Sequence, residues 1–421
     1  MPQTLPTPVT LGLNKSFGFG DRLGLATPGH LAAMKAHGQG FSGIYAQQSI
    51  REMTRTQRSP EEVMGAAQRS LAAAHYAAAW GADADHLKTV ADIDLTAKAG
   101  FTFFTLDPSP FVNNEADKLD QAALAAQVAA LLKDGIFPAG FDDEYLKGSH
   151  DLGAHGVLKF TREGLHRAAV KYGRAIAHIG VLSAHFEKTV KRPYEVEVSV
   201  DETDTPTKPL EHLFWALELR RRGVKHVVSL APRFIGDFEK GIDYKGDLKE
   251  FEKQLRVHAA IAEKFGPYKI SVHSGSDKFS IYPVIGRVCG TRLHVKTAGT
   301  NYLEALRVVV RVDPKLFGEI AAYDAGRFAQ DKQSYHISAT DAGVAALAKT
   351  APTDFERVYL DETTGRQLLH VTFGSTLTLG KTASGRLFKD AILEILGKHA
   401  DLHSEFLEKH LGKHLRLLNA G

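Results

Sequence analysis

The segment of residues 81–89 reads Gly-Ala-Asp-Ala-Asp-His-Leu-Lys-Thr. It follows an alanine-rich helical pattern, has the length of a short buried strand, and ends in a carboxylate, an imidazole and an ammonium group. Asp85 and His86 start on opposite sides of an ideal strand, but both can turn toward one pocket where a strand frays into a loop. The stretch predicts a buried strand that carries half of an active site at its end.

Seven further β-like runs also close on small or polar residues. They cover residues 16–22, 43–48, 101–107, 194–202, 226–231, 269–274 and 293–297. Helical patterns lie between several of them, at about 60–80, 210–222 and 248–265. Eight strands that alternate with helices and end in polar residues predict an α/β fold, a (β/α)8 barrel. A doubly wound open sheet is the alternative, but the Gly-x-Gly-x-x-Gly match at residues 38–43 precedes a strand instead of following one.

Two regions are longer than ordinary loops. Residues from about 113 to 193 show helical patterns without a convincing strand and predict a helical insertion after the fourth strand. Residues from about 301 to 421 predict a largely helical C-terminal extension, with one extra β-like run at residues 368–373. No repeat or low-complexity linker divides the chain, so we expect residues 1–421 to form a single barrel domain with these two additions.

Composition and charge exclude several classes of protein. The chain has 421 residues, of which 43% are hydrophobic and 24% charged, which is ordinary for a globular protein with a sizeable core. A net charge of +3 without a basic block does not support nucleic-acid or membrane-surface binding. Cys289 is the only cysteine, and neither a signal-peptide pattern nor a run of roughly 20 apolar residues occurs. We expect a cytoplasmic protein that does not enter a membrane; a homo-oligomer is compatible with the sequence, which sets no number of subunits.

The run at 194–202 has a polar face and an apolar face. Val196, Val198 and Val200 share one face, which in a barrel meets the surrounding helices, so the carboxylates of the other face point inward. Inward carboxylates need partners or a solvated site. Glu202 lies at the C-terminal end of this strand, which is the catalytic end of a barrel. An edge strand with a solvated acidic face is the alternative.

The run at 269–274 ends in a histidine and leads into a serine- and glycine-rich turn. His273 lies at a strand end that can face His86, and the following Ser274 and Lys278 suit an anion or several hydroxyl groups. A buried, hydrogen-bonded histidine beside an ordinary turn is the alternative. Two imidazoles with one or more carboxylates suit a divalent transition ion.

Further polar residues lie at or just past strand ends. Glu239 and Asp237 follow the strand at 226–231 and are candidates for a third metal ligand, but a solvated loop carboxylate explains either of them equally well. The remaining polar residues fit a hydroxyl-rich substrate better than an apolar one, although each alone could be a loop residue. They are Gln47, Lys88, Asp107, Arg233 and Lys296. No Walker-type loop or Gly-x-Ser-x-Gly elbow occurs, which disfavours nucleotide hydrolysis and serine-esterase chemistry.

At these residues the sequence resembles the tagaturonate epimerase family. The matching blocks are residues 16–24, 46–52, 85–89, 199–203, 239–244 and 273–278. The resemblance implies an isomerase that interconverts tagaturonate and fructuronate, which differ at C4, by means of a divalent metal ion and an acid/base pair. Carried onto the matching positions, it implies Asp85 as base, Glu202 as acid, and His86, Glu239 and His273 as metal ligands. Zn, Mn, Ni and Co are all candidates for the ion.

The chemistry of a C4 inversion sets further requirements. The C4 hydrogen of a 2-keto sugar is not adjacent to the carbonyl, so simple enolisation cannot remove it. Either an enediol shift of the carbonyl to C3 or retro-aldol cleavage of C3–C4 inverts C4, and both need a stabilised enediolate and two proton-transfer groups. A uronate also needs a cationic clamp, for which Arg51, Lys278 and Lys296 are candidates. The alternatives are a fructose/tagatose 4-epimerase, a metal-dependent aldolase and a non-enzymatic sugar-binding protein.

Overall fold

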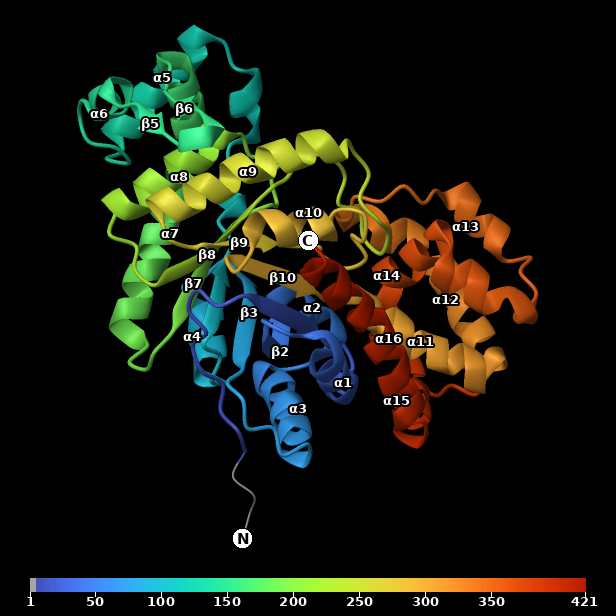
Figure 1. Cartoon of the computed structure of the whole chain (residues 1–421). Helices are drawn as coiled ribbons and strands as arrows, with labels where there is room; N and C mark the ends of the chain where they lie inside the picture. The colour runs from blue at the N-terminus through green and yellow to red at the C-terminus, as the bar shows by residue number, and fades with distance from the viewer. Residues whose placement is uncertain (1–4) are drawn as a thin grey trace.

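A closed barrel of eight parallel strands forms the centre of the protein (Figure 1). The computed structural model describes residues 5–421. Residues 1–4 belong to the N-terminal segment in which no signal peptide is expected, and they lie outside the described residues. The barrel strands are β1 (Ser16–Gly20), β2 (Ser42–Ser49), β3 (Gly81–Leu87), β4 (Phe103–Leu106), β7 (Glu195–Val200), β8 (Val227–Pro232), β9 (Lys269–Val272) and β10 (Leu293–Thr297). They pair in the order β1-β10-β9-β8-β7-β4-β3-β2, with β1 and β2 closing the ring. The predicted (β/α)8 barrel is confirmed, and each predicted run matches one of its strands.

Helices surround this barrel. They are α1 (Thr27–His37), α3 (Pro60–Ala73), α4 (Val90–Lys98), α7 (Arg162–Thr189), α8 (Pro209–Arg221), α9 (Leu248–Phe265), α10 (Tyr282–Cys289) and α16 (Ala400–Asn419). The last of them, α16, packs against both α1 and α10 (Figure 1). A Cβ atom at Gly286 of α10 would lie 2.1 Å from the backbone oxygen of Leu418 in α16, so this close approach requires glycine. The end of the chain therefore completes the helical layer around the barrel.

The helix predicted at about 60–80 is shorter than expected. α3 begins at Pro60, and the side chain of Ser59 caps it by accepting a hydrogen bond from the backbone N–H of Glu62. It ends at Ala73 instead of Trp80, because the chain leaves the helical conformation at His75, whose φ is +50°. The alanine-rich composition of this segment indicated a helix, but it did not show where the helix ends.

The segment between β4 and β7 is largely helical. It contains α5 (Gln121–Lys133), α6 (Phe141–Lys147), a two-stranded sheet of β5 (His150–Asp151) and β6 (Val157–Leu158), and α7. α7 packs against α4 and α8 and is therefore a helix of the barrel itself. The remaining elements form the lobe at the upper left of Figure 1.

The C-terminal region is also helical. After β10 the chain forms α11 (Gly299–Val312), α12 (Pro314–Asp331), α13 (Asp341–Leu347), α14 (Thr363–Thr378) and α15 (Phe388–Lys398) before it returns to the barrel through α16. The prediction of a further strand at residues 368–373 is wrong, because these residues lie inside α14 and all of them are buried. A short apolar run does not distinguish a buried strand from a fully buried helix. None of the helices within residues 5–421 is long and apolar enough to cross a membrane.

The interior of the barrel is polar. On β7, Val196, Val198 and Val200 belong to the apolar core outside the barrel, whereas Glu195 and Glu197 point inward as expected. At the N-terminal end of the barrel, Glu195 accepts hydrogen bonds of 2.9 and 2.7 Å from the backbone N–H groups of residues 11 and 12. Glu197 lies nearer the other end, where the candidate site begins.

Candidate active site

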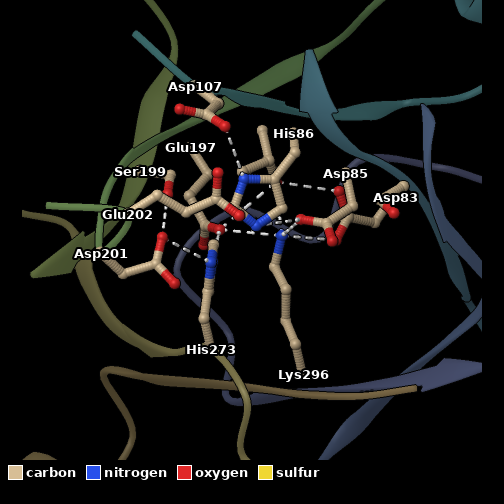
Figure 2. Close-up of polar contacts among 12 residues, drawn as sticks. Asp83, Asp85, His86, Asp107, Glu197, Ser199, Asp201, Glu202, His273 and Lys296 are labelled. Carbon is tan, nitrogen blue, oxygen red and sulfur yellow. Dashed lines mark hydrogen bonds and ion pairs between the residues drawn. The ribbon is translucent and has the colours of Figure 1, made fainter. Parts of the chain in front are cut away.

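β3 brings two functional side chains to one place. Asp85 and His86 both line the same hollow at the C-terminal mouth of the barrel (Figure 2). His86 has a φ of +55°, and the pairing of β3 with β4 shifts register between Ala84 and Leu87. This left-handed residue breaks the alternation of the strand. Both side chains therefore face one pocket although they are adjacent in sequence.

Two imidazoles lie at the centre of the site. The ring centroids of His86 and His273 are 5.1 Å apart. Nδ1 of His86 lies 3.0 Å from Oδ2 of Asp107, and Nε2 of His273 lies 2.6 Å from Oε1 of Glu197. These carboxylates orient the rings and leave Nε2 of His86 and Nδ1 of His273 available; the latter is 3.3 Å from Oδ1 of Asp201. A carboxylate that holds one ring nitrogen while the other remains available is typical of metal-binding histidines.

The charges in this cluster are strongly coupled. Burial lowers the pKa of both imidazoles, but nearby carboxylates outweigh this effect: Asp85 leads in raising the pKa of His86 to about 9, and Asp201 in raising that of His273 to about 10. Burial raises the pKa of Asp85, but the charge of His86 and then that of Lys296 lower it to about 2. Without a bound ion, both imidazoles are therefore cations at neutral pH, and Asp85 is an ionised carboxylate that can accept a proton.

Lys296 of β10 balances the carboxylates inside the barrel. Its Nζ lies 2.8 Å from Asp83 Oδ2, 2.8 Å from Asp85 Oδ1 and 2.9 Å from Glu197 Oε1 (Figure 2). It also donates a hydrogen bond to Thr105. Burial lowers the pKa of Lys296, but the three carboxylates raise it above its ordinary value, so the amine is protonated and is not a nucleophile. Lys296 was expected to bind substrate; the structure places it in the hollow with its charge already paired.

Glu202 lies at the rim of the site between two cations. Its Oε1 is 3.2 Å from Arg51, and its Oε2 is 3.5 Å from Lys88. Lys88 in turn lies 3.1 Å from Asp107, the partner of His86. The capping box at the start of α4 fixes the backbone at Lys88. Glu202 thus lies on a different strand end from Asp85, in a more exposed position.

The hollow at the barrel mouth has a cavity volume of about 80 Å³. Its wall includes Tyr335 and His370, which come from the C-terminal helical region, and Lys240, which comes from the loop after β8. No strand-end pattern indicated Tyr335 or His370, because they follow the barrel strands in sequence and meet the site only through tertiary packing. Glu197 and Asp201 carried a signal, since Glu197 lies on the inward face of β7 and Asp201 continues the same alternation directly after the strand ends at Val200.

Glu239, which the resemblance implied as a metal ligand, does not join the imidazoles. Its Oε1 lies 2.8 Å from Lys245 Nζ, and its Oε2 accepts hydrogen bonds of 2.7 Å from the backbone N–H of Ser338 and from the side chain of Gln367. It clusters instead with Asp237 and His336. The physical reason is the C-terminal region, which provides Ser338 and Gln367 and draws the carboxylate away from the barrel axis.

Lys278 and Asp107, which were expected to bind substrate, do not line the hollow. Lys278 is fully buried and donates to the backbone oxygens of Glu239, Ile242 and Ser276, so it holds the loop after β8 in place. Asp107 is only 1% exposed and contacts His86 and Lys88.

The other expected substrate-binding residues line the cleft. Ser274 and Gln47 border the main hollow, and Arg233 borders an adjoining outer hollow. Gln47 is held by a 3.3 Å hydrogen bond to the backbone oxygen of Thr297 and leaves its Oε1 without a protein partner among residues 5–421. A Cβ atom at Gly18 would lie 1.8 Å from this oxygen, so a larger residue at position 18 would displace the Gln47 amide.

The residues present fit a divalent cation. Single ligand atoms of Asp85, His86 and His273 all lie within 4.8 Å of one another. His273 Nδ1 is buried and forms no hydrogen bond with any described residue, although it lies beside Asp201. Nitrogen and carboxylate donors of this kind suit zinc, manganese, nickel or cobalt.

The fold and this cluster define a (β/α)8-barrel enzyme equipped for proton transfer on a polar substrate. Comparison with known proteins is consistent with that class. The sequence profile of the UxaE family, described as tagaturonate epimerase, matches residues 1–418. A tagaturonate/fructuronate epimerase of Thermotoga maritima is 43% identical over 411 residues, which are 98% of this chain and 82% of the relative.

Solved structures agree. A glycerol-complexed crystal structure of the fructuronate-tagaturonate epimerase UxaE from Cohnella laeviribosi superposes with a TM-score of 0.91 at 38% identity, covering 99% of this chain and 83% of that one. The native structure of the same enzyme gives a TM-score of 0.90 at 38% identity, with coverage of 98% and 83%. The chain belongs to the tagaturonate epimerase family, and it is an epimerase of the isomerase class.

Proposed function

We propose that this enzyme interconverts tagaturonate and fructuronate by inverting C4 with the help of a divalent metal ion. The observation that carries the proposal is the pair of imidazoles, each oriented by its own carboxylate, with the ionised Asp85 beside them. The family membership of the chain and the names of its relatives support the substrate pair.

His86 and His273 would hold the ion, through Nε2 and Nδ1 respectively, because their other nitrogens are engaged by Asp107 and Glu197. Asp201 is the carboxylate beside the available nitrogen of His273 and would be the third ligand. When bound, the ion would polarise the C2 carbonyl of the sugar and stabilise enediolate charge. Glu239 would need to leave three hydrogen-bonding partners to take part, so we do not assign it a ligand role.

The two proton-transfer groups would be Asp85 and Glu202. Asp85 is kept ionised by His86 and Lys296 and can accept a proton from the sugar. Glu202 lies on another strand end, near Lys88 and Arg51, and can serve the opposite side of the substrate. In a retro-aldol route, Asp85 takes the proton of the C4 hydroxyl while C3–C4 breaks; the aldehyde then rotates, C3–C4 forms again, and a proton returns to O4. In an enediol route, the same groups exchange the proton on C4 itself.

We also propose that the chain folds as one domain. α16 closes the helical layer of the barrel after the C-terminal helices have contributed Tyr335 and His370 to the site. Removal of residues after 300 would therefore remove part of the site and one barrel helix.

The test is conversion of tagaturonate by the purified protein, followed by NMR, with fructose as a separate substrate. We expect fructuronate to form, and turnover on the uronate to exceed that on fructose. Comparable or greater turnover of fructose would instead indicate a ketohexose 4-epimerase, and release of free three-carbon products would indicate an aldolase.

A further inference from the structure

The hollow contains one lysine, Lys240, whose ammonium group forms no ion pair with any residue that the structure describes. The carboxylates of the hollow are each paired: Glu52 with Arg22, Asp85 with Lys296, Asp201 with His273, and Glu202 with Arg51 and Lys88. Lys240, which lines the same hollow, forms no ion pair with any residue in the range 5–421. The only hydrogen-bond partner of its ammonium group within that range is Ser274, whose Oγ lies 2.5 Å from Nζ. A half-buried ammonium group with only a hydroxyl partner is incompletely compensated.

Lys240 is held in position by its loop. Glu239, the preceding residue, is fixed by Lys245, Ser338 and Gln367. On the other side, the fully buried Lys278 donates to the backbone oxygens of Glu239 and Ile242. The loop therefore presents the Lys240 ammonium group at a fixed place, next to the residue that follows His273. This arrangement explains why Glu239 and Lys278 are buried polar residues without lining the hollow.

We propose that Lys240 binds the terminal carboxylate of the substrate and so selects a sugar acid over a neutral ketohexose. The inference rests on the proposed function, because it assigns the carboxylate end of that substrate. Ser274, which bonds Lys240 and follows His273 in sequence, also lines the hollow and would provide a second hydrogen bond to the same end. The keto end of the sugar would then lie toward the imidazoles. Arg51, Lys278 and Lys296 were the expected clamps. Arg51 and Lys296 already have carboxylate partners, and Lys278 donates to three backbone oxygens.

The test compares two open-chain ligands by calorimetry on the metal-loaded enzyme. One is a six-carbon aldonate, and the other is the neutral alditol of the same configuration. We expect the wild type to bind the aldonate more tightly, and Lys240→Met to weaken aldonate binding by about 10- to 100-fold, the usual effect of losing one charge-assisted hydrogen bond. Alditol binding should change by less than about twofold, since it makes no charged contact. Lys240→Arg keeps the charge and should retain most of the preference.

Two matched variants separate this role from others. Arg233 lines only the outer hollow and, like Lys240, forms no ion pair with any described residue, so Arg233→Met should leave the preference intact. Lys249→Met removes an exposed lysine of α9 and should have no effect. Equal binding of both ligands by the wild type, equal weakening of both in Lys240→Met, or loss of the preference in Arg233→Met would each overturn the assignment. Failure of the wild type to epimerise tagaturonate would refute the proposed function instead, and the calorimetry does not depend on turnover.

Discussion

Replacing Lys296 by methionine should destabilise the protein more than any surface lysine replacement, and increasingly so as the pH rises. The ammonium group is 4% exposed and lies within 2.9 Å of three carboxylates, those of Asp83, Asp85 and Glu197. Removing one partner of a buried ion pair costs about 3–5 kcal/mol, because the remaining charge is left without compensation. We expect a loss of this size in the free energy of unfolding at pH 8. Total stabilities are roughly 5–15 kcal/mol, so the loss is a large fraction of what holds the fold.

The pH dependence follows from the carboxylates that remain. Without Lys296 their pKa values in the folded state rise above those in the unfolded chain, since burial and mutual repulsion are no longer offset. Asp83 already has a pKa raised to about 7 by burial in the wild type, despite Lys296. Groups with raised folded-state pKa values bind more protons when folded, so stability falls as pH increases above the unfolded values. The deficit of Lys296→Met should therefore be smaller at pH 5 than at pH 8.

Urea denaturation at both pH values measures this effect. Lys253→Met is the control, because Lys253 is 76% exposed and should leave the unfolding midpoint unchanged. If Lys296→Met does not fold at pH 8, adding Asp83→Asn should restore part of the stability by removing one excess charge. A midpoint equal to that of the control, or a deficit that does not change with pH, would refute the electrostatic account of the barrel interior.

Other consequences concern the metal and the proton transfers. Asp107→Asn should lower metal affinity by roughly 10- to 100-fold, as loss of an orienting carboxylate does, and metal titration by calorimetry would show it; unchanged affinity would contradict the role of Asp107. Because the imidazoles of His86 and His273 have pKa values of about 9 and 10 without an ion, binding must displace protons, so affinity should rise from pH 7 to 9, and the heat of binding should vary with the ionisation enthalpy of the buffer. Asp85→Asn should lower kcat by about 100- to 10,000-fold while the metal stays bound, and an unaffected kcat would exclude Asp85 as the base. Glu239→Gln should retain the metal, and its loss would restore Glu239 as a ligand.

The barrel could be predicted because each of its strands carries its own signal. β7 alternates valine with carboxylates, which fixes the outward and inward faces from local sequence. β3 carries Asp85 and His86 at its C-terminal end, and that is where the hollow opens. The opposite case is α14, whose residues 368–373 are all buried, so no exposed polar face reveals a helical period.

The candidate site could be predicted only as far as strand ends determine it. Asp85, His86, Glu202 and His273 lie at strand ends and converge because barrel strands are parallel. The direction of a loop side chain is set by residues distant in sequence. Glu239 turns toward Gln367 and Ser338, and the sequence around Glu239 does not predict these contacts. For the same reason the adjacent Lys240, not Glu239, lines the hollow.

Epimerisation of tagaturonate should be measured with protein from which metal has been removed, before and after divalent ions are added back. The same assay would be run on His86→Ala and His273→Ala, with metal content determined for each protein. We predict that the stripped wild type is inactive and recovers with added ion, and that both variants lose the ion and the activity. Full activity in the stripped protein, or in a variant without either imidazole, would contradict the account.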